Sequence, residues 1–173
     1  MAFTMIVTIN ETEASRVFSG LRDALSDMTV LMDNMGRVLV SSARSRIDTT
    51  NRAPDGSLWP QSQRAREHGG KTLYETGLLL GSINAWAGTD HVMVGSNAPY
   101  ARIHQEGAEQ GQFGARAGRT RPSTKRPKSQ DYFFMLPWGD IPARPYIGLS
   151  QDDEATVVEL AEAHFSDIVA GLQ

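Results

Sequence analysis

The fold of this chain is decided by residues 77–107, GLLLGSINAWAGTDHVMVGSNAPYARIHQEG. Ser82–Ala87 and His91–Val94 carry β-prone residues on either side of the turn Gly88-Thr89-Asp90. Gly and Asp favour tight turns, and alternating valines favour a half-buried strand. The stretch therefore predicts two short strands joined in a hairpin.

A short helix is expected directly after this hairpin, near Tyr100. Gly95 and Pro99 interrupt the extended pattern, and Asn97 or Ser96 is the expected N-cap because short polar side chains bond the free amides of a first turn. Nothing in the stretch is typical of a catalytic centre. It is typical of a small sheet with a short helix beside it.

Two longer helices are predicted at the ends of the chain. One runs from about Thr12 to about Ile47, because apolar residues recur there at steps of three or four. The other opens at Ser150 with Asp153, a capping-box pattern. Its apolar face carries Val157, Leu160, Ala161, His164, Phe165, Ile168 and Leu172. Both apolar stripes need a partner, either the sheet or a neighbouring chain.

The remaining segments before residue 107 are shorter. Phe3–Ile9 is β-prone and predicts an opening strand, and Asp48–Arg66 is typical of a loop that Trp59 anchors to the body. Gln61–Arg66 is expected to form a short polar helix, and Leu73–Ile83 has helical spacing that two glycines weaken. We therefore predict an α+β fold, with the long N-terminal and C-terminal helices packed on a small, mostly antiparallel sheet.

Residues 107–140 are predicted to form a long extended loop or arm of a single domain that spans residues 1–173. The segment is unevenly charged, with basic residues at Arg116, Arg119, Arg121, Lys125, Arg126 and Lys128. A dense aromatic run follows, with Tyr132, Phe133, Phe134 and Trp138. Such a run should be buried in the subunit or covered by a partner. A surface flap and an assembly arm are equally compatible with this pattern.

The composition of the 173 residues bounds the class of protein. The chain is 40% hydrophobic and 21% charged, with a net charge of −3 and no cysteine. This balance is typical of a globular protein and disfavours one that coats nucleic acid with its whole surface. No apolar run reaches the roughly 20 residues that a membrane span requires, and the N-terminus lacks the features of a signal peptide, so we expect no membrane association.

Motifs for chemistry are weak throughout. Gly70-Lys71-Thr72 ends like a phosphate loop, but Ala65 stands where the first glycine belongs. His104-Gln105-Glu106 resembles a zinc-deaminase pattern, which requires cysteine ligands that this chain lacks. The four histidines show no metal-ligand spacing. We therefore expect no enzyme activity, no metal site and no cofactor.

Arg116–Lys128 has three open interpretations: a solvated loop, contact with an acidic protein surface, or contact with DNA phosphates. In sequence it lacks the interleaved aromatic residues that a surface for single-stranded DNA would favour. The DNA-contacting module is kept as the alternative function.

Several short motifs occur in the order found in a known family. They are Pro54-Asp55-Gly56 with Trp59, Leu73 to Ile83 with Thr76-Gly77, Val94-Gly95-Ser96, Tyr100-Ala101 with Ile103-His104-Gln105 and Gly107, and Ile141–Ser150. With these motifs the chain resembles the phage virion morphogenesis, or tail completion, proteins of Mu-like and related tailed phages. The match spans most of positions 50 to 150. The long basic insertion at 107–140 and Glu106 in place of an aromatic residue depart from the family pattern.

The resemblance implies a structural protein of the virion, not an enzyme, that completes the tail or neck and helps to join head and tail. It further implies a homo-oligomeric ring, as in tail terminators and neck proteins, with other tail or connector proteins as partners and assembly in the cytoplasm of the bacterial host. Ring contacts are expected from the sheet region Ala85–Val94, and from the Tyr132–Trp138 run or the long helix.

Seven matching residues are expected to have structural roles: Trp59, Gly77, Gly95, Tyr100, His104, Arg144 and Pro145. The glycines are expected at tight turns or close packing. Arg144, held between prolines, is expected to bond a carbonyl or a carboxylate, and His104 to hydrogen-bond in the core or at a subunit contact.

Overall fold

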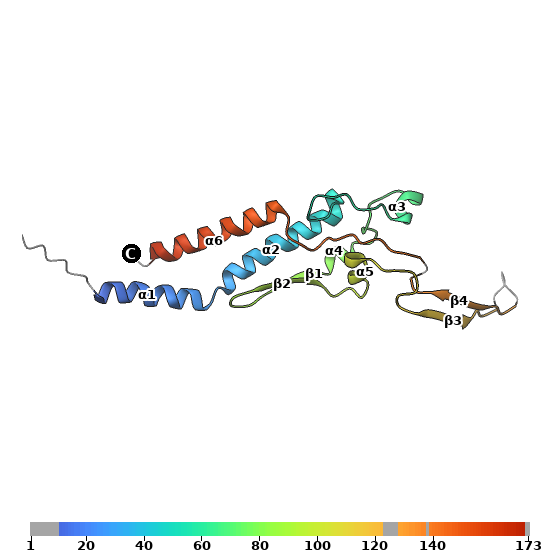
Figure 1. Ribbon diagram of the computed structural model, residues 1–173, viewed down its shortest axis with the longest axis horizontal. Helices are drawn as coiled ribbons and strands as arrows, with labels where there is room; N and C mark the ends of the chain where they lie inside the picture. Colours follow the sequence, from blue (N-terminus) through green and yellow to red (C-terminus); the bar gives the residue numbers. More distant parts are fainter. Residues whose placement is uncertain (1–10, 123–127, 138, 172–173) are drawn as a thin grey trace, which may run out of the picture.

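Three layers of secondary structure form the body of the protein. The computed structural model describes residues 11–122, 128–137 and 139–171. Helix α2 (Thr29–Ser45) lies between helix α6 (Gln151–Gly171) and the hairpin of β1 (Ile83–Ala87) and β2 (Val92–Ser96), as Figure 1 shows. Helix α1 (Glu11–Ser26) extends beyond α2 at one end. The predicted α+β class is confirmed.

The central hairpin forms as predicted. β1 and β2 are antiparallel, with Ala85 opposite Val94 and Trp86 opposite Met93, and the Gly88 amide donates to the His91 carbonyl at 2.8 Å. Helix α2 lies against one face of this hairpin at Gly36. A Cβ at Gly36 would lie 2.8 Å from the Cβ of Ala85, so the close approach of helix and sheet requires glycine there.

The predicted single helix from Thr12 to Ile47 is wrong, because the structure divides it at Asp27 and Met28. The Asp27 carboxylate accepts a hydrogen bond from the Thr29 amide at 3.0 Å, and the Met28 amide donates to the Thr89 carbonyl in the hairpin turn at 2.9 Å. Both bonds compete with the helical pattern. The apolar periodicity of the sequence continues across residues 27 and 28, so it does not reveal the break between the two helices.

The segments between α2 and the hairpin agree in part with the predictions. Helix α2 continues into a short π-helix, Arg46–Thr50, and helix α3 (Gln63–His68) forms close to the predicted polar helix. The helical spacing of Leu73–Ile83 yields only the short helix α4 (Leu78–Gly81), because Leu73 and Gly77 both have positive φ angles. The predicted strand Phe3–Ile9 lies outside the described residues.

Helix α5 (Ala101–Glu106) is the short helix expected after the hairpin, but its predicted cap is wrong. Tyr100 precedes the helix without a side-chain capping bond. Ser96 instead bonds Ser82 Oγ at 2.6 Å, and its Oγ accepts from the Ala98 amide at 3.2 Å. Ser96 therefore closes the turn that leads into α5.

The core lies where α2, β1, α4, α5 and the extended segment 141–149 meet. Ile47, Ile83 and Tyr146 are fully buried there. The other buried members of the cluster are Ala43, Ala53, Trp59, Leu79 and Ala101. Trp59 anchors its loop as predicted, since its Nε1 donates to the Pro145 carbonyl at 2.9 Å.

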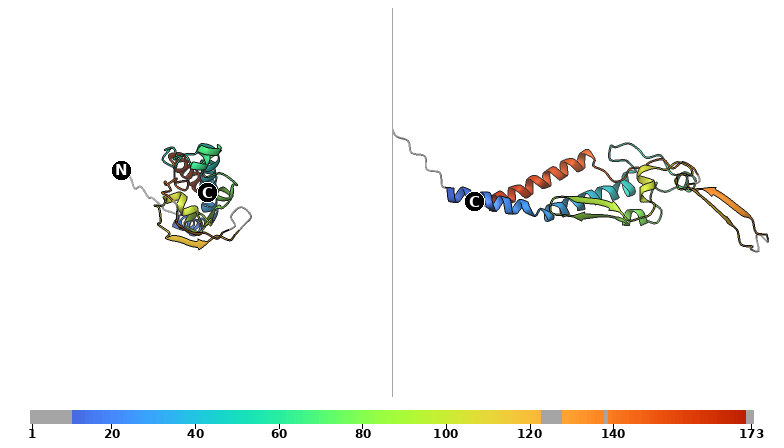
Figure 2. Two further views of the ribbon diagram at one scale, coloured as in Figure 1. Left: turned by 90° about the vertical axis from the view of Figure 1, so that its right-hand side faces the viewer. Right: turned by 60° about the horizontal axis from the view of Figure 1, so that its bottom comes forward.

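Residues 107–140 are not a structureless loop. They contain a second antiparallel hairpin, β3 (Ala115–Arg119) and β4 (Asp131–Met135), with Ala117 opposite Phe133. We call residues 115–135 the arm. Figure 2 shows the arm directed away from the body, at the end opposite α1 and the end of α6. Neither strand was predicted, because the small and basic residues of β3 carry little β propensity and the aromatic run of β4 was interpreted only as a surface to be covered.

A buried ion pair connects the two long helices of the body. Arg46, just after α2, contacts the carboxylate of Asp153 in the first turn of α6, and both side chains are at most 7% exposed. Arg46 also donates to the carbonyls of Tyr146 at 3.1 Å and Gly148 at 2.8 Å. The predicted capping box is confirmed, because the Ser150 amide donates to Asp153 at 2.9 Å and the Asp153 amide donates to Ser150 Oγ at 3.2 Å.

The carboxyl of Asp153 is held in its charged form. Burial alone would raise its pKa, but hydrogen bonds from Ser42 and Ser150 and the charge of Arg46 outweigh burial and lower the pKa below its usual value. A buried carboxylate with so many donors has one stable protonation state at neutral pH.

We predict that Asp153→Asn lowers the free energy of unfolding by about 3–5 kcal/mol, because Arg46 keeps its charge in a buried site without its partner. Chemical denaturation followed by circular dichroism measures this loss. The matched control is Asp23→Asn, whose pair with Arg22 is exposed at both side chains and contributes little.

The same pair predicts a pH dependence. Because the folded-state pKa of Asp153 is lowered, its contribution is complete well above the unfolded-state pKa of about 3.9 and is lost as the pH falls through that value and below. Asp153→Asn should therefore lose less stability than the parent between neutral and acid pH. Equal losses in the two proteins would contradict this account.

Candidate interaction surfaces

The arm has two faces of different character. Strand alternation and the register place Ala115, Ala117, Phe133 and Met135 on one face, which we call the arm face. All four are exposed, and Phe133 is 68% exposed. Met135 lies against Gly111, where a Cβ would be 3.2 Å from its sulfur, and the exposed Arg119–Asp131 pair lies on the same side nearer the tip. The apolar surface around Phe133 is the part of the arm face that is left uncovered.

The opposite face of the arm is covered by its own side chains. Tyr132 and Phe134 stack with ring centroids 5.8 Å apart. A Cβ at Gly118 would lie 2.5 Å from the Tyr132 hydroxyl, so the tyrosine ring lies over the glycine. The two aromatic residues are half-buried, whereas Phe133 and Met135 are exposed. Of the two expected outcomes, burial within the subunit does not hold for Phe133 and Met135, so cover by a partner stays the prediction for these two residues.

The basic residues follow the arm towards its tip. Arg116 lies on the side of Tyr132 and Phe134, Arg119 donates to the Asp131 carboxylate at 2.8 Å, and Arg121 is exposed beyond the strand. Lys128 is exposed at the other side of the tip. Lys125, Arg126 and Trp138 lie outside the described residues. The hairpin thus brings arginine and aromatic residues together although the sequence separates them.

A second bare surface lies on the body, on the side of the β1–β2 hairpin that faces away from α2. We call it the sheet face and define it by Asn84, Trp86, Met93 and Gly95. Trp86 is 52% exposed and its cross-strand neighbour Met93 is 58% exposed. The sequence predicted Trp86 to be half-buried, and nothing in the alternation of this short strand distinguished the covered face from the bare one.

A third surface combines α1 and the outer part of α6. Phe18 is 71% exposed, and Val158 and Val169 are 54% and 50% exposed. The predicted apolar face of α6 is only half-buried within the subunit, and Leu172 lies outside the described residues. Acidic residues surround the exposed side of α6: Asp152, Glu154, Glu159, Glu162 and Asp167. The helices therefore present an apolar and acidic surface.

Five of the predicted structural residues meet in one region between α5 and the segment 141–149: Trp59, Tyr100, His104, Arg144 and Pro145. The Arg144 amide donates to the His104 carbonyl at 2.8 Å. Arg144 Nε donates to the Pro60 carbonyl at 2.7 Å, as expected for an arginine held between prolines. These bonds connect three segments distant in sequence.

His104 was expected to hydrogen-bond in the core or at a subunit contact. Its Nδ1 is buried without a hydrogen-bond partner, and its ring meets Tyr100 edge-on at 5.8 Å. Burial and the charge of Arg144 lower the pKa of His104, so the ring is neutral at pH 7.

Gly77 and Gly95, the two glycines among the predicted structural residues, have different roles. Gly77 has a positive φ of 77° before α4, whereas Gly95 lies in a strand beneath Trp86. Gly95 therefore serves packing and not a turn.

Gln105 of the same helix fixes the extended segment. Its side-chain oxygen accepts from the amides of Tyr146 at 3.0 Å and Ile147 at 3.1 Å, and its nitrogen donates to the Ile147 carbonyl at 2.8 Å. No role was predicted for this glutamine from the sequence, because its partners are backbone groups 41 and 42 residues away.

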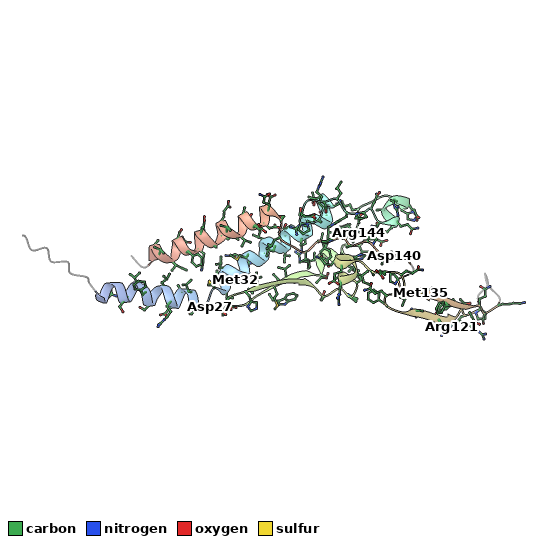
Figure 3. All side chains as sticks on the ribbon, viewed as in Figure 1. Asp27, Met32, Arg121, Met135, Asp140 and Arg144 are labelled. Atoms are coloured by element: carbon green, nitrogen blue, oxygen red, sulfur yellow. The ribbon has the colours of Figure 1, made fainter. Side chains whose placement is uncertain are left out.

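The described residues form candidate interaction surfaces. Within residues 11–122, 128–137 and 139–171, no group of three or more acidic residues and histidines is placed to hold a metal ion. In the same part of the chain, no helix has the length and apolar character of a membrane span. What the arrangement provides is a projecting arm, visible in Figure 3 on the side of Met135 and Arg121, and three partly uncovered apolar surfaces.

Comparisons with known proteins agree with these features. The family model described as phage virion morphogenesis family matches residues 9–166. The Mu-like prophage FluMu G protein 2 of Haemophilus influenzae is 26% identical over 160 residues, which cover 92% of this chain and 94% of that protein. No solved structure matches the chain. The chain belongs to the phage virion morphogenesis family.

Proposed function

We propose that this protein completes the tail or neck of a tailed phage or prophage and helps to join head and tail, by assembling into a ring. Membership of the family implies a structural component of the virion that contacts other phage structural proteins. Its place in tail or neck, the ring, and the absence of enzyme activity are our proposal.

The observation that carries the proposal is the arm. It projects from an elongated body, and the arm face is exposed over Phe133 and Met135. Exposed apolar surfaces of this kind mark contacts with other proteins. A ring whose subunits meet through two different patches needs both patches on each subunit, and the arm and the sheet face lie on different parts of this molecule.

A DNA-contacting module is the second candidate. The hairpin places Arg116 beside Tyr132 and Phe134, and it leaves Arg121 and Lys128 exposed at the tip. Guanidinium groups next to aromatic rings can bind phosphates and stack on bases. Arg119 contributes less to such a surface, because it already pairs with Asp131.

We predict that deletion of residues 115–135, with Gly114 joined to Leu136, leaves the body folded and abolishes self-association. The Leu136 amide already donates to the Gly114 carbonyl at 2.8 Å, so the joined ends are adjacent. The hydrophobic core contains no residue of the arm. Thermal unfolding should change little, while light scattering over a concentration series should show a closed oligomer for the full chain and a monomer for the variant.

The ring proposal would be contradicted by a full chain that stays monomeric at every concentration, or by an oligomer of the same size without the arm. A large loss of thermal stability on deletion would show that the arm belongs to the fold of the body.

For DNA, we predict that fluorescence anisotropy detects no duplex binding by the full chain at about 200 mM salt, because a few phosphate contacts lose most of their affinity there. The variant Arg116→Ala, which changes only the side of the arm that carries Tyr132 and Phe134, should then assemble normally at that salt. Arg22→Ala, at an exposed position of α1, is the matched control. DNA binding that persists at this salt and is lost only in the arm variant would favour the DNA-contacting module instead.

A further inference from the structure

We propose that the sheet face is the docking site for the arm of a second copy of this chain, with the arm face packed on Trp86 and Met93. This inference rests on the proposed ring and names the contact that builds it. The arm tip would lie at the neighbour's β1–β2 turn, where Asp27 and Asp90 meet its arginines.

The arm requires a partner for its own stability. A two-stranded hairpin alone in water is marginally stable at best. β3 and β4 pair only with each other, and α2 covers one face of β1–β2 but no helix covers a face of the arm among the described residues. Because the second face of the arm is closed by the Tyr132–Phe134 stack, the arm face is the side left for a partner.

That partner is another copy, because the arm cannot reach its own sheet. Figures 1 and 2 show the arm leaving the body at the end opposite α1 and pointing away from β1 and β2. A subunit that gives its arm to one neighbour therefore receives an arm from another. Contacts of this head-to-tail kind close into rings when the rotation between subunits allows it.

The two faces match in shape. Both are formed by antiparallel pairs of five-residue strands, so both are about 17 Å long and both carry the right-handed twist of a two-stranded ribbon. Large and small side chains are distributed so that they can interdigitate. Trp86 and Met93 project from the sheet face, and the small Ala115 and Ala117 on the arm face leave room for them. Phe133 and Met135 can in turn lie beside the Trp86 ring, which covers Gly95, and over Asn84.

Charge fixes the direction of the arm on the sheet. Figure 3 shows Arg121 far out on the arm and Asp27 between α1 and α2, well apart from it, so the two do not meet within one chain. Asp27 and Asp90 lie together at the hairpin turn, since the Met28 amide donates to the Thr89 carbonyl at 2.9 Å. Hydrogen bonds from Thr29 and His91, respectively, lower the pKa of these two exposed carboxyls, so both are charged at neutral pH.

The strongest competing dock is α6, which is apolar at Val158 and acidic along its exposed side. A helix presents a narrow curved stripe, whereas the sheet face offers a two-stranded surface with an exposed tryptophan, a residue type enriched at the centres of protein interfaces. The experiment therefore compares these two docks directly.

The absence of cysteine from the chain permits a clean crosslinking test. We would place Cys at Asn84 and Ala117 in one full-length chain, which keeps Trp86, Met93 and Phe133 intact. A bis-maleimide reagent that spans about 10 Å, the spacing of two stacked sheets, would then join neighbouring subunits. We expect a ladder of covalent oligomers on a denaturing gel, and we expect Trp86→Ala in the same chain to abolish it without changing the unfolding midpoint.

The matched control carries Cys at Val158 and Ala117, which should give no ladder. Crosslinking of Ala117 to Val158 in place of Asn84, or a ladder that survives Trp86→Ala, would overturn the proposal. Oligomers by light scattering without an Asn84–Ala117 crosslink would reject this docking and leave the ring intact. A chain that is monomeric by light scattering and also fails to crosslink would reject both.

Charge reversal tests the direction of docking in the same assay. Arg121→Asp should slow the crosslinking of Asn84 to Ala117, and Asp90→Arg in the same chain should restore it. Slow crosslinking in the double variant, or no effect of Arg121→Asp, would contradict the contact between tip and turn.

Discussion

The body of this protein depends on one buried contact, the pair of Arg46 and Asp153. Through it the end of α2, the start of α6 and the extended segment around Tyr146 share one arginine. Leaving either charge buried without its partner would cost free energy, so arrangements that separate Arg46 from Asp153 are disfavoured. The contact explains how two helices distant in sequence hold a fixed relation over a sheet of only two strands.

The arm obeys the opposite constraint. It shares no core residue with the body, and its exposed face carries residues that a soluble monomer would cover. The body is stabilised by its own buried ion pair, whereas the arm has no helix packed on it among the described residues. We therefore expect the arm to reach its stable form only in contact with a neighbouring subunit. This division agrees with membership of the phage virion morphogenesis family.

The sequence predicted those parts of the structure that rest on local patterns. The β1–β2 hairpin, the capping box at Ser150 and the anchoring role of Trp59 follow from turn chemistry, short-range spacing and residue size. The break at Asp27, the burial of Asp153 and the role of Gln105 depend on partners far along the chain, which periodicity cannot detect. Strand β3 was missed because alanine, glycine and arginine carry little β propensity. The interaction surfaces stay a prediction, and which face of each hairpin is exposed followed only from its packing.

The central claim is that the arm is stable only on a neighbour. The most direct measurement is amide hydrogen exchange of residues 115–119 and 131–135, compared between dilute protein and assembled protein. We expect rapid exchange of the arm amides in the monomer. On assembly we expect strong protection of the arm together with the β1–β2 hairpin that carries the sheet face. Strong protection of the arm in the dilute monomer, or assembly that leaves its exchange unchanged, would contradict the account.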